Sequence, residues 1–339
     1  MMDRIPTGCK AVDELLDGGL ATGTITQVFG EKALGKSIFS YQAACSAVAS
    51  GHSAVILDTE QSYSSYLIPY RRAGMDKRFG KEIKTADLRL ERVARPSGKK
   101  KEGVSRSEII TNIATALDRL GVSYTNAHLG PIADILCPSF TVDVPKDVSS
   151  VFILQTPEVT DLLNLHGVDA AKEVSKGGRV ELRLRQTPTY ESVLHQIIRD
   201  TGANLLVYDS ISAPFKSSFP STQDLPARSA GLAMILSHAQ RLCVDFGIAV
   251  LVVSHVSIDP INPWNRRPYG GIILGHEAKF CLELTRSKAK RKSKGNEEPE
   301  AENEEDMTDE GRAFWVARHP AMAEYSRYGF ANIDEEGFH

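Results

Sequence analysis

The stretch from Thr24 to Ser37 reads TITQVFGEKALGKS, and the interpretation of the whole chain starts from it. Its first part, TITQVF, is apolar and rich in β-branched residues, which predicts a short strand. Its second part fits the pattern GxxxxGK[ST] through Gly30, Glu31, Lys32, Ala33, Leu34, Gly35, Lys36 and Ser37. Apolar residues then recur at helical spacing from Ile38 to Val48. The order of strand, glycine loop and helix predicts a loop that binds phosphate groups, with an ordinary glycine turn as the alternative.

The predicted loop suits the phosphates of a nucleotide. Backbone N–H groups in such a loop converge on the phosphates, and the helix N-terminus adds a partial positive charge. Lys36 would neutralise the β- and γ-phosphates, and we expect its side chain to point at solvent when no phosphate is bound. Ser37 would offer its hydroxyl to Mg²⁺. We therefore predict ATP and magnesium as cofactors, with contacts from Gly30 to Ile38.

Three further apolar runs end on polar residues, as expected for strands of a parallel sheet with helices between them. These runs are residues 54–57, before Asp58-Thr59-Glu60; residues 205–208, before Asp209; and residues 248–253, before Ser254-His255. In open α/β sheets, ligands bind outside the carboxyl ends of the strands. The polar residues are therefore expected near the phosphate loop.

Two carboxylates of this edge are assigned chemical roles. Asp209, together with Ser37, would hold the magnesium ion through water, with a capping role in the next turn as the alternative. Hydrolysis also needs a group that orients the attacking water. We favour Glu60 over Asp58 for that role, because alternate residues of a strand point to opposite faces.

A series of motifs follows one order along the chain. It comprises Pro6-Thr7-Gly8-Cys9-Lys10, Asp13-Glu14-Leu15-Leu16, Gly18-Gly19, the phosphate loop, Asp58-Thr59-Glu60, Leu206-Val207-Tyr208-Asp209-Ser210, Gly270-Gly271 and Leu274-Gly275-His276. This series resembles the ATPase core of the RecA superfamily, and more narrowly the archaeal RadA and RadB recombinase group. The resemblance implies an α/β fold with a central, mostly parallel, twisted sheet flanked by helices. It also implies that Lys36 and Glu60 are catalytic and that Asp209 and His255 lie at the nucleotide.

The resemblance further implies two loops that face DNA, at about residues 215–228 and 257–271. The second loop carries Trp264, Arg266, Arg267 and Tyr269. Aromatic rings can stack on bases while guanidinium groups contact phosphates, although a proline-rich surface loop is the alternative. The implied partners are single-stranded DNA and a recombinase or other repair protein, with assembly into a homo-oligomer left open.

The chain departs from the family pattern at three points. It starts at the core, where a full recombinase carries an N-terminal domain, so we expect a paralog or mediator of the RadB type. The phosphate loop has Lys32, Ala33 and Leu34 where the family has extra glycines, and Ser254-His255 replaces the usual Asn-Gln. We therefore expect slow hydrolysis, with its coupling to DNA in question.

The segment 84–178 does not continue the alternation of strands and helices. We expect an inserted α/β subdomain or lid there, between a first part of the core, residues 1–83, and a second part, residues 179–339. It contains a predicted helix between Ser105 and Gly121. The strand at residues 180–184 is expected to lie beside the catalytic strand, and residues 285–311 are expected to form a charged loop.

The composition excludes several classes of protein. Hydrophobic residues make up 42% and charged residues 24% of the chain, which is ordinary globular usage. No apolar run approaches the length of a membrane span, and five scattered cysteines without a CxxC pair argue against a zinc site or a disulfide framework. We therefore expect a cytoplasmic protein without a membrane partner.

The net charge of −3 argues against a uniformly basic nucleic-acid binder but not against local basic patches. Two alternatives to a DNA-linked ATPase stay open. One is a regulatory ATPase of the KaiC-like kind, which would control a protein partner without DNA. The other is a subunit that binds a nucleotide without turning it over.

Overall fold

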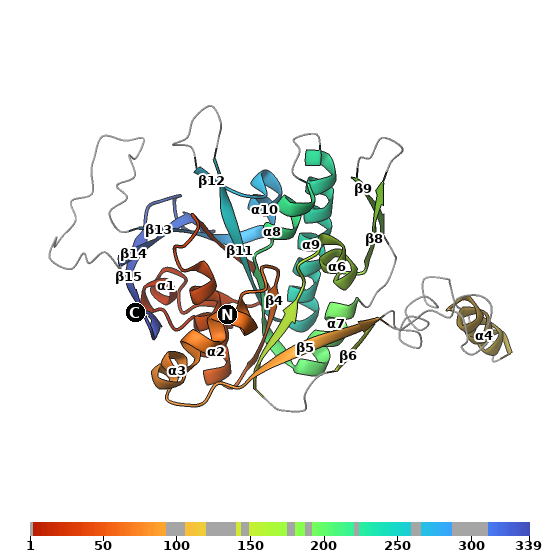
Figure 1. Cartoon of the computed structure of the whole chain (residues 1–339), viewed down its shortest axis with the longest axis horizontal. Coiled ribbons are helices and arrows are strands. Elements are labelled where there is room, and N and C mark those ends of the chain that lie inside the picture. The colour runs from red at the N-terminus through yellow and green to blue at the C-terminus, as the bar shows by residue number, and fades with distance from the viewer. Residues whose placement is uncertain are drawn as a thin grey trace.

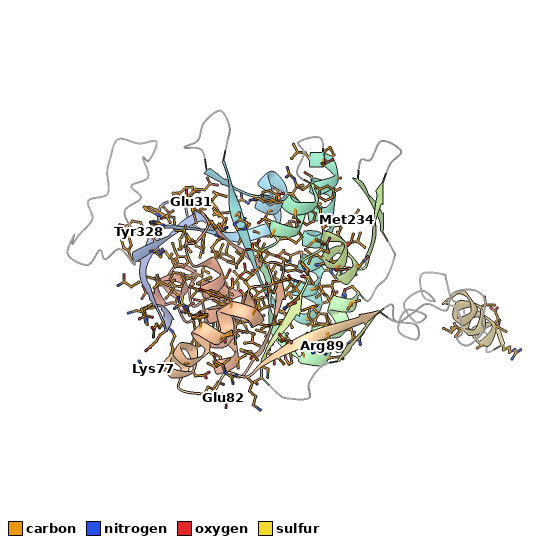
Figure 2. All side chains as sticks on the ribbon, in the orientation of Figure 1. Glu31, Lys77, Glu82, Arg89, Met234 and Tyr328 are labelled. Atoms are coloured by element: carbon orange, nitrogen blue, oxygen red, sulfur yellow. The ribbon has the colours of Figure 1, made fainter. Side chains whose placement is uncertain are left out.

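The computed structural model describes residues 3–92, 106–119, 140–143, 149–174, 180–186, 192–219, 224–258, 266–286 and 311–339 (Figure 1). Its main feature is a sheet with strands in the order β16-β15-β14-β13-β3-β11-β10-β4-β7-β5-β6, with β12 paired to β11. The strands are β3 (Ile25–Gly30), β4 (Ser53–Asp58), β5 (Thr85–Arg92), β6 (Phe140–Asp143), β7 (Val151–Gln155), β10 (Ala203–Asp209), β11 (Ala249–Ile258), β12 (Arg266–Pro268), β13 (Ala278–Arg286), β14 (Gly311–Arg318), β15 (Tyr328–Asp334) and β16 (Gly337–Phe338).

The centre of this sheet is parallel. Every neighbouring pair from β13 through β3, β11, β10, β4 and β7 to β5 runs parallel. Antiparallel strands are added at the two ends of the order, where β14, β15 and β16 follow β13 and β6 follows β5. The predicted α/β fold with a mostly parallel central sheet is confirmed.

Helices cover both faces of the sheet (Figure 1). Helices α1, α2 and α3 pack in one hydrophobic core, and helices α6, α7, α8 and α9 pack in a second core. Their bounds, with those of the remaining helices, are α1 (Lys10–Leu15), α2 (Lys36–Ala49), a π-helical turn (Tyr63–Leu67), α3 (Ile68–Phe79), α4 (Arg106–Arg119), α6 (Val159–Leu165), α7 (Val193–Thr201), α8 (Ala213–Ser218), α9 (Leu225–Phe246) and α10 (Gly271–Glu277).

The apolar runs of the sequence explain why the strands lie between two layers of helices. In β4, Ala54 and Ile56 belong to the core with α2, whereas Val55 and Leu57 belong to the core with α9. Parallel strands that are buried on both faces read as continuous apolar runs, and all four of these side chains are fully buried. The same alternation holds through β10 and β11.

The sheet crosses the boundary expected at residue 84. Strand β7, within the segment 84–178, pairs with core strand β4, and β5 pairs with β7. Strand β7 reads VFILQ, and its first four residues are buried, because it is covered by helices on both faces. Strands β5, β6 and β7 of this segment therefore belong to the central sheet, whereas its last strand, β8, does not.

The strand expected beside the catalytic strand lies elsewhere. Strand β9 (Val180–Gln186) pairs with β8 (Val168–Val174) in a separate antiparallel hairpin, and β10 has β4 and β11 as neighbours. The sequence of β9, VELRLRQ, alternates apolar and charged residues. A strand of that pattern suits a sheet with one solvated face and not the doubly covered sheet. A second small pair, β1 (Arg4–Ile5) and β2 (Leu20–Ala21), is also antiparallel.

Four further expectations concerned a helix before Gly121, a charged loop at residues 285–311, the cysteines and membrane spans. Helix α4 forms at the predicted position, whereas most of the charged stretch 285–311 lies outside the described residues. Cys9, Cys45, Cys243 and Cys281 are buried and form no disulfide, as expected. No helix in the described part of the chain is long and apolar enough to cross a membrane.

Three histidines meet between α6, α7 and α9, of which His166 and His195 are buried and His238 is half-buried. The Nδ1 atoms of His166 and His238 are 2.9 Å apart, and the rings of His195 and His238 lie 5.0 Å apart. The His166 Nε2 is 3.2 Å from the Tyr208 hydroxyl, and the His195 Nε2 is 3.6 Å from an Asp245 oxygen. Burial lowers the pKa of His166 well below its usual range and lowers the pKa of His238 to about 3.

This cluster predicts a loss of stability in mild acid. In the unfolded chain a histidine takes up a proton near pH 6.5, whereas His166 and His238 stay neutral in the folded chain. The unfolded state therefore binds more protons below pH 6.5. The free energy of unfolding should fall by about 1.4 kcal/mol per pH unit for each such histidine as the pH drops toward the folded pKa.

Urea unfolding at pH 7 and at pH 5 measures this loss. The variant His238→Gln should lose less stability between the two pH values than the parent, whereas His276→Gln, at an exposed histidine, should behave as the parent does. Equal losses in the parent and in His238→Gln would contradict the account.

Candidate nucleotide-binding site

The phosphate loop begins where β3 ends, and both of its fixed glycines have structural reasons. A Cβ atom at Gly30 would lie 2.5 Å from the backbone oxygen of Leu284 on the neighbouring strand. Gly35 has a φ of +97° and caps the N-terminus of α2, and a Cβ there would lie 2.7 Å from Ile333. Ala33 also has a positive φ, of +62°. The backbone between strand and helix is therefore closely constrained.

The middle of the loop is anchored by its one apolar side chain. Leu34 is buried, and its backbone oxygen accepts a hydrogen bond from Arg312 Nε at 3.3 Å. Glu31, Lys32 and Ala33 are exposed. In place of the extra glycines of the family pattern, this loop has two exposed residues, Lys32 and Ala33, and the buried Leu34.

Lys36 lies inside this loop. Its Nζ donates hydrogen bonds to the backbone oxygens of Gly30, at 3.1 Å, and Glu31, at 2.6 Å, and its side chain is buried. The expectation that it points at solvent is wrong, because two loop carbonyls accept hydrogen bonds from its ammonium group. Burial lowers the pKa of Lys36, while the charges of Asp209 and Glu60 raise it. The carbonyl groups that hold the Lys36 ammonium carry no net charge, so they do not neutralise it. Its positive charge can therefore attract an anion.

Asp209 stands at the end of β10, opposite the start of α2. The Tyr63 hydroxyl donates a hydrogen bond to its Oδ2 at 2.6 Å. Burial raises the pKa of Asp209 to about 6, against hydrogen bonds from Tyr63 and Ser37 that lower it. The carboxylate and the Ser37 hydroxyl are therefore neighbours, and oxygen donors of this kind suit Mg²⁺.

The described residues do not offer a metal site built from the protein alone. None of their histidine, cysteine and carboxylate side chains gathers in a group of three or more that could hold a metal ion. Mg²⁺ keeps several waters and is usually bound through one or two carboxylates together with substrate phosphates. Ser37 and Asp209 fit that mode of binding.

Asp58 is the last residue of β4 and Glu60 follows the strand, and the two carboxylates have different surroundings. The Asp58 carboxylate accepts backbone hydrogen bonds from Glu60, Ser62 and Tyr63, at 3.2, 3.2 and 2.9 Å. Asp58 is fully buried, so it shapes the turn that leads into the π-helical segment. Glu60 is exposed at the carboxyl edge of the sheet. The geometry gives Asp58 a structural task and leaves Glu60 accessible.

Glu60 contacts the neighbouring strands through its side chain. Its Oε1 accepts a hydrogen bond from Ser210 Oγ at 2.9 Å and lies 3.1 Å from His255 Nε2. The hydrogen bond from His255 is the main cause of a lowered pKa for Glu60. The carboxylate therefore stays ionised at neutral pH, and it is held by residues of β10 and β11.

Tyr63 was not singled out in the sequence, although it completes this site. It is fully buried, five residues after Asp58, and its hydroxyl reaches both Asp209 and the backbone oxygen of Ser37, the latter at 3.3 Å. The only sequence signal is an aromatic residue shortly after the strand that ends in Asp58-Thr59-Glu60. Such a residue is common, so its role depends on the fold.

Some of the residues expected to contact DNA lie in a strand or in the interior of the protein, and not on an exposed loop. Arg266 and Arg267 lie in β12, which pairs with β11, and Trp264 lies outside the described residues. Tyr269 is only 7% exposed, so its ring is not available to stack on a base in this structure. Phe215, at the start of the first expected DNA loop, is fully buried in α8. Tyr269 and Phe215 thus pack in the core, whereas Leu225 of the first loop is exposed.

Two family models match the chain. The model of the Rad51 family matches residues 182–311, and the model of the KaiC family of ATPases matches residues 5–129. The first match covers Asp209 and His255, and the second covers the phosphate loop and Glu60. The two matches therefore divide the site described above between them.

Curated relatives are named DNA repair proteins. The DNA repair protein rhp51 of Schizosaccharomyces pombe is 24% identical over 298 residues, which cover 85% of this chain and 57% of the relative. The DNA repair protein RAD51 of Saccharomyces cerevisiae is 23% identical over 295 residues, 84% of this chain and 51% of the relative. The DNA repair and recombination protein RadB of Halobacterium salinarum is 48% identical over 56 residues, 16% of this chain and 24% of the relative. The matched regions span at most 57% of these relatives.

The hydrogen bond from Tyr63 to Asp209 should affect how strongly the site binds magnesium. It favours the ionised form of Asp209, so Tyr63→Phe should raise the pKa of that carboxyl further above its value of about 6. A rise of about one unit in the pKa of Asp209 corresponds to a free energy of ~1.4 kcal/mol, which is the contribution expected of such a hydrogen bond. Protonated Asp209 is a poorer partner for magnesium. The Mg²⁺ concentration that half-saturates ATP binding should therefore rise more at pH 6.5 than at pH 8.

The matched control is Tyr66→Phe, which changes an exposed tyrosine of the same π-helical segment. It should leave the magnesium dependence unchanged at both pH values. The assignment of Asp209 fails if Tyr63→Phe also shows the parent's magnesium dependence at pH 6.5.

Proposed function

The chain belongs to the RecA superfamily and is related to the RadA and RadB recombinases, and from that premise we propose that it binds and slowly hydrolyses ATP in DNA recombination or repair. One observation carries the proposal. Lys36, Ser37, Glu60 and Asp209 come from three separate parts of the chain and meet at the carboxyl edge of the parallel sheet. Nucleotides bind at that edge in open α/β folds.

Each residue at the edge has a task in this proposal. Lys36 binds the terminal phosphates, and Ser37 and Asp209 hold magnesium, which would neutralise phosphate charge when bound. Glu60 orients the attacking water, for which its ionised carboxylate is suited. The remaining contacts of the nucleotide come from the loop between Gly30 and Ile38.

The surroundings of Glu60 support slow turnover. His255 and Ser210 both hydrogen-bond its Oε1, and these bonds lower its pKa. A carboxylate with a lowered pKa is a weaker base, so it takes up a proton less readily in the transition state. We propose His255 as the residue that senses the terminal phosphate, since it lies on β11 in register with Gly30 of the phosphate loop.

DNA is the proposed macromolecular partner. Strand β12, which carries Arg266 and Arg267, pairs with the end of β11 that follows His255. Named DNA repair proteins among the relatives support a role with single-stranded DNA and a repair protein. We propose that this chain acts beside a recombinase, as a paralog or mediator, and leave self-assembly as an option within that role.

A regulatory ATPase is the second candidate. The match of residues 5–129 to the KaiC family model, which includes the phosphate loop and Glu60, covers a domain that both candidates share. Such a protein would bind ATP and a protein partner without DNA. Binding to a single-stranded oligonucleotide that weakens with salt would favour the recombination role, and no binding at low salt with ATP and Mg²⁺ would favour the regulatory role.

Glu60→Gln should separate ATP binding from hydrolysis. The amide keeps the size of the side chain but cannot accept a proton, so affinity for ATP should stay within about twofold while kcat falls by about 10²-fold or more. Steady-state phosphate release and equilibrium binding measure the two effects. Glu14→Gln, at an exposed residue of α1, is the control. Hydrolysis at the parent's rate in Glu60→Gln would move the role to another group.

Replacing Arg266 and Arg267 by Ala should weaken binding to a single-stranded oligonucleotide. Two lost phosphate contacts should also reduce the slope of log affinity against log salt by about one to two units. Alanine at Arg199 and Arg241, exposed on α7 and α9, should leave the slope unchanged. If the slope does not change in the Arg266 and Arg267 variant, the basic run from Arg286 to Lys294 is the next candidate.

A further inference from the structure

Two cations flank the buried ring of Tyr269. The Lys216 Nζ lies 4.8 Å from the centre of the ring, and the Arg228 Cζ lies 5.2 Å from it. Lys216 comes from α8, Arg228 from α9 and Tyr269 from the segment between β12 and α10. Three elements that are distant in sequence therefore bring two positive charges to one aromatic ring, which attracts both.

Within the part of the chain that the structure describes, neither Lys216 nor Arg228 has a carboxylate within ion-pair distance. Burial is the main reason that the pKa of Lys216 is lowered; the charge of Glu60 raises it, and the charge of Arg228 lowers it. Like charges held together repel each other, and an anion placed beside them would remove that repulsion. The arrangement is typical of a place where an anionic ligand binds.

The ring is tied to the candidate nucleotide site. The backbone N–H of Tyr269 donates a hydrogen bond to the backbone oxygen of His255 at 2.8 Å, and the His255 side chain contacts Glu60. The charge of Lys216 also lowers the pKa of Lys36, so the two ammonium groups are close enough to act on each other. An anion that meets Lys216 here would lie on the Glu60 side of the phosphate loop.

We infer that the Lys216 ammonium binds the terminal phosphate of a nucleoside triphosphate, and that Tyr269 is the positioning residue that holds Lys216 for this contact. The inference rests on the proposed function, since it assumes that the loop with Lys36 binds the nucleotide. Lys36 contacts the β- and γ-phosphates, and it keeps its contact with the β-phosphate in a diphosphate. Lys216 then supplies preference for the triphosphate, because a diphosphate does not extend to it.

Equilibrium binding of two nucleotides tests the inference on the full chain. The probes are ADP and an ATP analogue with a nonhydrolysable imido bridge, both with Mg²⁺. Lys216→Gln should weaken binding of the analogue about tenfold and change ADP binding by less than about twofold, since one charged hydrogen bond to the third phosphate is lost. Lys10→Gln, at an exposed lysine of α1, should change neither.

Two substitutions at Tyr269 test its positioning role. Tyr269→Phe keeps the aromatic ring and should keep the parent's preference for the analogue over ADP. Tyr269→Leu removes the ring and should reduce that preference toward the value in Lys216→Gln. Circular dichroism and a thermal midpoint check that each variant is folded, and Tyr269→Phe serves as the rescue if Tyr269→Leu is unstable.

Three results would overturn the inference. Equal losses of affinity for ADP and for the analogue in Lys216→Gln would mean that the charge of Lys216 attracts both nucleotides without a specific contact to the third phosphate. An unchanged preference would mean that Lys216 does not contact the third phosphate. Weaker binding of a single-stranded oligothymidine without nucleotide, together with an unchanged preference, would assign the anion to the DNA backbone. The proposed function fails separately, if the parent binds neither nucleotide or if Lys36→Ala binds both as the parent does.

Discussion

Parallel pairing of β10 with β4 on one side and β11 on the other is the constraint on which the site depends. It places Asp209 in register with Asp58, and the pairing of β11 with β3 places His255 in register with Gly30. Because all four strands point the same way, their polar ends meet at one edge. The apolar runs that lead to these ends are buried on both faces, so the edge position of each polar residue is fixed by the packing of its strand.

The same edge gives three carboxylates three different environments. Asp58 is buried, and its backbone hydrogen bonds oppose the rise in pKa that burial causes. Asp209 is also buried, with a pKa raised to about 6, beside the Ser37 and Tyr63 hydroxyls. Glu60 is exposed and has a lowered pKa because of His255. These surroundings agree with a structural, a metal-holding and a water-orienting role, respectively.

The parts of this account that could be predicted from sequence are those that depend on local patterns. The phosphate loop, helix α2 and the strands ending at Asp58 and Asp209 follow from short motifs and apolar runs. What could not be predicted depends on pairing across long separations in sequence. Strand β7 joins β4 nearly a hundred residues away, and β9 leaves the sheet for a hairpin with β8.

The same distinction applies to single side chains. Lys36 was expected at solvent because the motif says nothing of the carbonyls that hold its Nζ. Tyr269 was expected to contact DNA because the resemblance placed it in a DNA-facing loop with aromatic and arginine residues. In the structure Tyr269 lies between Lys216 and Arg228. Tyr63 carries no motif, yet its hydroxyl joins the end of β10 to the first turn of α2.

The central claim is that the carboxyl edge of this sheet binds ATP through the loop that holds Lys36. Isothermal titration calorimetry of the full chain with ATP and Mg²⁺ tests it most directly, with Lys36→Ala measured beside the parent. Circular dichroism checks that both proteins are folded. We expect saturable binding of about one ATP per chain in the parent and at least a hundredfold loss of affinity in Lys36→Ala, since a charged contact to two phosphates is removed. Equal affinity in a folded Lys36→Ala protein would contradict the account.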